Sequence, residues 1–225
     1  MCKVAVFGII VTLAVFLLSR LVYKRWSVVI LSPILTSLLA MIAILVSLHV
    51  SYKEYWVSAK WLKFMLQPAT VAFAIPLYKY FPVLRRNAVP LLTSIILGGI
   101  TAVTTSVLFA DLFHLQGLAA SLAPRSITTP LAMDTSAAIG GNPVLTAVFV
   151  IVTALVGIMT GPLLIRRLKL RSKFAQGALM GTGAHAIGTS RAFEMGQLEG
   201  TIASIALIIN GVSTVVLAPL LMHWM

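Results

Sequence analysis

A stretch of polar and helix-breaking residues interrupts the apolar sequence at 126–143. It reads SITTPLAMDTSAAIGGNP and holds prolines, adjacent glycines, several hydroxyls and Asp134. At membrane depth, backbone broken by Pro and Gly is tolerated only where protein or a water-filled cavity satisfies the freed N–H and C=O groups. An ionisable side chain there is costly and by default marks a functional site. The segment therefore predicts a polar binding site inside a membrane protein.

The chemistry of this segment suits a small anion. A broken helix exposes N–H groups at a positive dipole end, and the guanidinium of Arg125 could hold a carboxylate in bidentate fashion. Asp134 could carry a coupling proton. The alternative is structural: Arg125 extends to the membrane interface and Asp134 caps a half-helix at an aqueous surface. The candidate substrate contacts are Arg125, Thr128, Thr129, Thr135 and Ser136.

A second segment at 180–200, MGTGAHAIGTSRAFEMGQLEG, is rich in glycine and in polar residues. Histidine titrates near neutral pH, so His185 suits a proton relay, although a lone buried histidine more often serves packing. Part of the glycine signal reflects close helix packing. The candidates here are Thr189, Ser190 and Arg191 for the substrate, and His185 and Glu194 for a proton.

Gln67 is a third candidate substrate contact. It stands beside Pro68, so its amide could donate and accept next to backbone groups that the proline frees. A plain proline kink explains the pair equally well.

Several classes of protein are excluded. No His/Cys/Asp cluster has metal-ligand spacing, the glycines at 181–188 lack a preceding strand and a Lys-Ser/Thr ending, and no G-x-S-x-G elbow is present. Cys2 is the only cysteine, so no disulfide framework is expected. We predict no enzyme activity, no catalytic residue, no metal and no cofactor.

Composition indicates an all-α integral membrane protein that forms one domain over residues 1–225. The chain is 60% hydrophobic and only 10% charged, with a mean hydropathy of +1.03, whereas soluble domains carry about 25% charged residues. The net charge of +12 could suggest nucleic acid. However, thirteen of the seventeen basic residues lie at the ends of apolar segments or in short loops, as the positive-inside rule describes, so nucleic-acid binding is excluded.

The apolar segments predict a polytopic bundle of about six to eight membrane segments, with broken or re-entrant half-helices. The segment at 64–82 contains Pro68 and Pro76 and must be kinked or unwound. The irregular segments are 126–143 and 174–196. The candidate spans are 4–19, 28–50, 64–82, 89–110, 144–165 and 200–222.

The charge rule gives an orientation. The loops at 20–25 and at Arg85 and Arg86 should be cytoplasmic, which places the N-terminus and a loop at 51–63 outside. If 126–143 crossed the membrane fully, the basic cluster at 166–173 would lie outside, against the same rule. We therefore expect 115–143 to enter and return on one side, as a re-entrant hairpin or a pair of half-helices.

A short match between two parts of the sequence suggests an internal repeat. The tetrapeptide TSAA at 135–138 matches TSRA at 189–192, and each is followed by glycine and then by an apolar span. Interrupted segments in corresponding positions are the best sequence indication of a transporter binding site.

The chain resembles the LrgB/CidB family of bacterial membrane proteins. The stretches that carry the resemblance are LQPATVAFAIPLY (66–78), LAPRSITTPLAM (122–133), AIGGNPVLTAVFVI (138–151) and GALMGTGAHAIGTSRAFEMGQLEG (177–200). YohK-type inner-membrane proteins and the membrane domain of the plastidal glycolate/glycerate transporter are similar in these stretches.

The resemblance implies two functions that remain open. The first is a secondary transporter of small monocarboxylates such as pyruvate, glycolate or lactate. The second is an antiholin-like regulator of murein hydrolase export and lysis. It also implies a holin-like membrane partner of the LrgA/CidA type and a multi-pass location in the bacterial inner membrane, where a homo-oligomer is possible.

Overall fold

The computed structural model describes residues 2–26, 33–72 and 74–224, and these residues form helices joined by short turns, without a strand among them. The all-α class expected from composition is thereby confirmed. The chain divides into two compact units, Met1–Ala74 and Ile75–Met225. We call them unit 1 and unit 2 and describe each by itself.

Unit 1 contains the helices α1 (Cys2–Trp26), α2 (Pro33–Ser47) and α3 (Tyr52–Ala72). Helices α1 and α3 approach closely, because the backbone N–H of Gly8 donates to Ser58 Oγ at 3.0 Å. One turn further along α1, the hydroxyls of Thr12 and Tyr55 are hydrogen-bonded at 2.9 Å. A Cβ at position 8 would lie 2.3 Å from Ser58 Oγ, so this contact requires glycine.

Two expected loops of unit 1 are helical, which corrects the sequence analysis. The segment 51–63 belongs largely to α3. Its start is a capping box, in which Ser51 N–H donates to Glu54 Oε2 and Glu54 N–H donates to Ser51 Oγ. The basic segment 20–25 lies within the end of α1, because Lys and Arg are good helix formers and favour helix C-termini.

The expected span at 64–82 is covered by α3, α4 (Ala74–Lys79) and α5 (Phe81–Arg86), and residue 73 lies outside the described residues. Pro68 lies within α3 and Pro76 within α4. The described backbone leaves helical geometry at Tyr80, between α4 and α5. This break comes after both of the prolines from which the sequence predicts a kink, and Pro82 follows it in the first turn of α5, where proline is tolerated.

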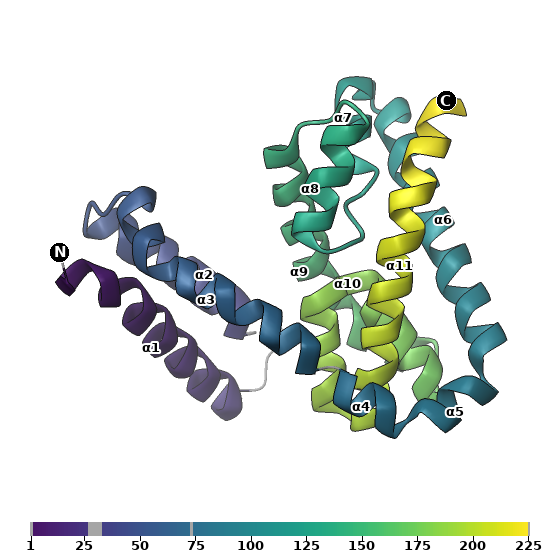
Figure 1. The fold of residues 1–225 in the computed structure, drawn as a ribbon, viewed down its shortest axis with the longest axis horizontal. Helices are drawn as coiled ribbons and strands as arrows, with labels where there is room; N and C mark the ends of the chain where they lie inside the picture. Colours follow the sequence, from purple (N-terminus) through teal and green to yellow (C-terminus); the bar gives the residue numbers. More distant parts are fainter. Residues whose placement is uncertain (1, 27–32, 73, 225) are drawn as a thin grey trace. The chain divides into compact units, whose positions relative to one another are not determined.

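Three helices of the described chain are long and apolar enough to cross a membrane: α6 (Ala88–Leu112), α9 (Pro143–Arg167) and the apolar part of α11 (Gln197–Trp224). They match the spans expected at 89–110, 144–165 and 200–222, and the protein is a multi-pass membrane protein. Helices α6 and α11 run side by side in the same direction (Figure 1). Ile95 and Ile202 share one apolar cluster, and Val107 and Ala218 share another nearer the ends of both helices.

The chain between α6 and α9 enters unit 2 and returns. Its helices α7 (Gln116–Leu122) and α8 (Thr129–Ala138) are at most about 15 Å long, too short to cross a membrane. Ser121 Oγ accepts the N–H of Asn142 at the start of α9. The turn between the helices, in contrast, places Arg125 against Ser106 and Thr153, about 9 Å from the end of α6 and about 15 Å from the start of α9. This confirms the re-entrant expectation, and we call 116–138 hairpin 1.

Helix α10 (Lys173–Met195) is also a hairpin. Its backbone leaves helical geometry at Ala184 and at His185, where φ is +42°. A Cβ at Gly188 would lie 2.0 Å from the carbonyl oxygen of Met180, and Met180 shares a cluster with Ala192. These residues would be far apart along a continuous helix. The chain therefore turns back on itself, and we call 173–195 hairpin 2, with arms 173–183 and 186–195.

The two hairpins enter unit 2 from opposite ends. Hairpin 1 starts where α6 ends, and hairpin 2 starts where α9 ends, beside the start of α6 (Figure 1). Asn87 and Ser172 line one pocket, so Arg85 and Arg86 at the end of α5 lie at the same end of unit 2 as the basic segment 166–173, as the charge rule requires. We call this the basic end. Each hairpin is followed by a crossing helix. Residues 116–167 and 173–224 are thus two copies of one arrangement with inverted direction, the architecture of many transporters.

Candidate functional site

The turns of the two hairpins meet beside the middle of α9. Arg125, from the turn of hairpin 1, donates through Nη1 to Thr153 Oγ1 at 3.4 Å. One turn along α9, a Cβ at Gly157 would lie 2.5 Å from the carbonyl oxygen of Gly183 and 2.7 Å from Ala184 Cβ. Glycine at position 157 therefore lets the turn of hairpin 2 lie directly on α9. The imidazole of His185 lies against the backbone of Arg125.

Arg125 is a partly buried cation with neutral partners. Its Nε donates to Ser106 Oγ of α6 at 2.8 Å, which fixes the guanidinium between α6 and α9. Among the described residues, the ion pairs join Lys173 to Glu199 and Arg191 to Glu194, and none involves Arg125. A charge held away from water without a counter-ion is costly. The arrangement therefore suits an anion that comes from outside the chain.

His185 supplies a second polar group at this point. Its side chain is 3% exposed, and its Nε2 atom is buried without a hydrogen-bond partner. Its φ of +42° is unusual for a residue other than glycine. Such backbone strain persists where the surrounding structure holds it and is frequent at ligand sites.

Three more buried oxygen atoms without partners belong to the turn of hairpin 1 and to α11, which contacts it. Asn210, in the middle of α11, donates through Nδ2 to the carbonyl of Ser126 at 2.8 Å, and Thr214 follows one turn later. The hydroxyls of Ser126 and Thr214 and Oδ1 of Asn210 lack partners. Many other threonine hydroxyls in these helices bond the carbonyl four residues earlier, as Thr201 does. Thr214 does not, so its buried hydroxyl has no partner within the described protein.

Backbone dipoles add positive character to the same place. Helix α8 begins directly after Thr128, and its N-terminus has no side-chain cap. The returning arm of hairpin 2 likewise begins directly after His185. Two helix N-termini thus start at the meeting point, where unpaired N–H groups attract anions. With Arg125, they form a site that can bind one small anion.

The site lies near mid-depth of the crossing helices. Thr153 is ten residues into α9, about 15 Å from its start, and Asn210 is thirteen residues into α11, about 20 Å from its start. Transporters with inverted repeats bind substrates at this depth.

The structure brings together only part of the set that the sequence predicts. Arg125, Thr128 and Thr129 lie at or beside the turn of hairpin 1, and His185 forms the turn of hairpin 2. Thr189 lies one turn away and bonds the carbonyl of His185 at 2.9 Å. These placements agree with the proposed site, and the roles of the residues stay predictions.

Other predicted residues lie further along the arms. Thr135 bonds the carbonyl of Leu131 within α8, and Ser136 Oγ accepts from Thr146 Oγ1 at 2.7 Å, joining α8 to α9. Asp134 is exposed.

In hairpin 2, Ser190 is exposed and bonds the carbonyl of Ala186. Arg191 pairs with Glu194 one turn away, about 9 Å along the arm from His185. The side chain of Gln67, in unit 1, lies outside the described residues.

Ser106, Ser126, Thr153, Asn210 and Thr214 were not among the residues that the sequence predicted for the site. Asn210 carried a usable signal, because it is an amide inside the otherwise apolar segment 200–222, and polar residues within spans are commonly functional. The serine and threonine residues gave no such signal, since these residue types are frequent in membrane helices and usually bond their own backbone.

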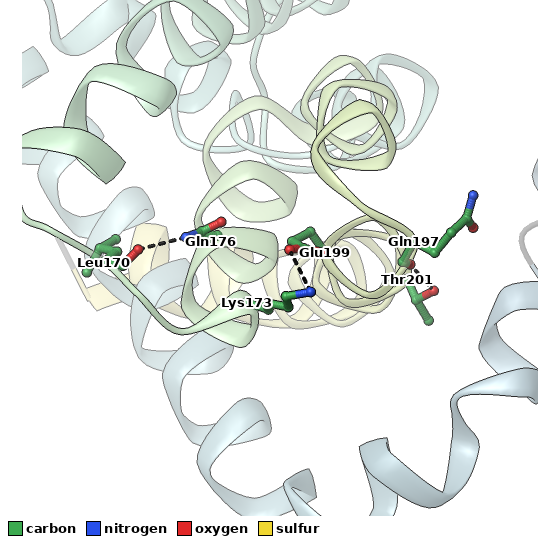
Figure 2. Close-up of polar contacts among 6 residues, drawn as sticks. All are labelled: Leu170, Lys173, Gln176, Gln197, Glu199 and Thr201. Carbon is green, nitrogen blue, oxygen red and sulfur yellow. Dashed lines mark hydrogen bonds and ion pairs between the residues drawn. The ribbon is translucent and has the colours of Figure 1, made fainter.

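Polar contacts also close the base of hairpin 2 at the basic end (Figure 2). Lys173 Nζ lies 3.8 Å from Glu199 Oε1, and Gln176 Nε2 donates to the carbonyl of Leu170 at 2.7 Å. A Cβ at Gly177 would lie 2.5 Å from the carbonyl oxygen of Glu199. The first arm of the hairpin is thereby fixed to the start of α11.

Comparison with known proteins identifies relatives along almost the whole chain. The sequence model of the LrgB-like family matches residues 12–224. The chain is 44% identical to protein YwbG of Bacillus subtilis over 223 residues, 99% of each chain. It is 36% identical to the antiholin-like protein LrgB of the same organism, over 95% of this chain and 93% of the relative. No solved structure matches the chain.

Proposed function

Because this chain belongs to the LrgB family, we propose that it is a secondary transporter that binds a small monocarboxylate where hairpins 1 and 2 meet. Pyruvate, glycolate and lactate are the substrate class. The proposed location is the bacterial inner membrane, and the whole chain is proposed to act as one transmembrane domain.

The observation that carries this proposal is the pairing of Arg125 with hydroxyls alone. A guanidinium presents a planar pair of N–H donors that matches a carboxylate. Ser106 and Thr153 orient it without neutralising it. A carboxylate bound there would supply the missing counter-charge, and the helix N-termini beside Thr128 and His185 would add N–H donors.

The inverted hairpins support transport rather than binding alone. Each hairpin covers the site from one end of unit 2, so displacement of one hairpin would open the site toward that end only. This is the arrangement that alternating access requires.

Substrate binding and uptake test the proposal. Purified protein in lipid nanodiscs should bind labelled pyruvate, glycolate or lactate saturably, and proteoliposomes should accumulate it. Arg125→Ala should abolish both, whereas Arg25→Ala, which removes an exposed cation at the end of α1 in unit 1, should leave binding intact. Equal loss in the two variants, or no saturable binding by the unmodified protein, would refute the proposal.

A second function is favoured by the names of relatives, several of which are called antiholin-like protein LrgB. Under this alternative, the chain regulates murein hydrolase export and lysis together with a holin-like membrane protein of the LrgA/CidA type. It predicts that Arg125→Ala retains its effect on lysis when the two proteins are expressed together. Loss of that effect in step with carboxylate uptake would instead make lysis control a consequence of transport.

A further inference from the structure

A pocket of about 580 Å³ opens between α6 and the first arm of hairpin 2. Along α6 it extends from Asn87 to Ile95, and along the hairpin it extends from Ser172 to Thr182. Since the helical rise is 1.5 Å per residue, the pocket reaches about 15 Å inward from the basic end. Most of its lining is apolar, and polar side chains occur at both ends and between them, at Asn87, Ser94, Ser172 and Thr182.

The inner end of this pocket stops one helical turn short of the site. Thr182 precedes His185 by three residues. Ile95 precedes Gly99 by four, and a Cβ at Gly99 would lie 2.7 Å from Asn210 Oδ1. The pocket therefore points from the basic end toward the turn of hairpin 2 and the amide of α11.

Glycines leave space between the pocket and the site. A Cβ built on Gly183, the residue after Thr182, would meet no atom within 4 Å, and neither would one built on Gly98. Gly183 is exposed although it lies next to the buried Ala184. Open space thus continues past Thr182 along the hairpin turn.

The mouth of the pocket is strongly basic. Arg85 and Arg86 line an adjoining surface pocket with Phe81 and Pro82. The opposite end of unit 2, residues 111–117 and 139–143, contains no lysine or arginine. A cluster of one charge sign at the mouth of a cleft raises the local concentration of ions of the other sign. The remaining cations of this end are Arg166, Arg167, Lys169, Arg171 and Lys173.

We propose that this pocket is the aqueous route by which the carboxylate passes between the Arg125 site and the basic end of unit 2. Its mouth attracts the anion, and Gly183 leaves it room at the turn of hairpin 2. Ser94 and Thr182 donate to the carbonyls of Pro90 and Ala178, so their hydroxyl oxygens can accept from the water that accompanies the anion. The inference rests on the proposed transport function and adds the path and the side from which the site is reached in this conformation.

Cysteine accessibility tests this route. In a Cys2→Ser background, Thr182→Cys should react with the water-soluble anion 2-sulfonatoethyl methanethiosulfonate in inside-out membrane vesicles. A saturating carboxylate substrate should slow the reaction at least several-fold, and Arg125→Ala should abolish this protection. Thr160→Cys is the matched control, because Thr160 also bonds its own helix backbone but lies outside the pocket, on the surface of the apolar span α9. The bilayer should cover this surface, so Thr160→Cys should not react with the anionic reagent.

The outcomes separate the route from the transport function. If Thr182→Cys reacts only with a lipid-soluble maleimide, the pocket holds acyl chains and the route is refuted, while carboxylate binding at Arg125 can still be measured. If Thr182→Cys reacts with the anionic reagent and no carboxylate slows it, the pocket is wet but is no substrate route. Failure of the unmodified protein to bind carboxylates would refute the proposed function itself.

Discussion

Arg125 differs from the other cations of unit 2 in lying far from both ends and in being held by two hydroxyls, Ser106 Oγ and Thr153 Oγ1. The contacts come from separate atoms of one planar group, Nε and Nη1. This leaves the remaining N–H donors of the guanidinium for a ligand. The planar geometry of the guanidinium, as well as its charge, should therefore matter for carboxylate binding.

Replacing Arg125 by lysine tests whether the planar donor geometry of the guanidinium is required. Lysine keeps the charge but cannot contact both hydroxyls and a carboxylate with fixed geometry. We expect Arg125→Lys to lower carboxylate affinity about 10-fold or more, the equivalent of one charge-assisted hydrogen bond. Equilibrium binding in nanodiscs measures this, and unchanged affinity would reduce Arg125 to a point charge.

We predict that His185, rather than Asp134 or Glu194, carries the coupling proton. His185 forms a hairpin turn at the site, whereas Asp134 is exposed and Glu194 pairs with Arg191. We expect His185→Gln, which removes the titrating ring, to lower uptake driven by an imposed pH gradient while sparing counterflow at equal pH. Asp134→Asn should leave both unchanged. The reverse pattern would identify Asp134, and not His185, as the proton carrier.

At the scale of elements, hairpin 2 depends on the close approach of its own arms. A Cβ at Gly188 would lie 2.0 Å from the carbonyl oxygen of Met180, whereas a Cβ at Gly183 would meet nothing within 4 Å. Gly188→Ala should therefore destabilise the protein by about 1–3 kcal/mol, and Gly183→Ala by less than about 0.5 kcal/mol. Thermal unfolding in detergent compares them, and equal transitions would contradict the hairpin.

Sequence patterns predicted hairpin 1, but for hairpin 2 they predicted only an irregular segment at 174–196. The sequence match between 135–138 and 189–192 falls on the returning arm of each hairpin, α8 and 186–195, so it reflected a real structural repeat. The reversal at Ala184–His185 was not predictable, because positive φ normally indicates glycine and histidine occupies the position. Asn210 joins Ser126 across 84 residues, a contact that no local pattern contains.

For the whole molecule, the structure supports an orientation that labelling can check. In a Cys2→Ser background, Ser172→Cys lies at the basic end and Gly117→Cys at the start of hairpin 1, and both positions are exposed. An impermeant thiol reagent added to intact cells should label Gly117→Cys and not Ser172→Cys, because basic ends face the cytoplasm. Labelling of Ser172→Cys from outside would show that unit 2 has the opposite orientation in the membrane.

The contact between Asn210 and Ser126 also sets an order for assembly at the ribosome. The turn of hairpin 1 is bound by a helix whose centre is synthesised 84 residues later, and Ala119 and Ala123 of that hairpin region share a core cluster with Ala218. At about 5–20 residues per second, hairpin 1 waits about 4–17 seconds for its partner. During this interval its short, polar arms must be sheltered by the insertion machinery or held at the membrane surface. A chain that stops before α11 would therefore retain most of its apolar segments and still fail to form the site.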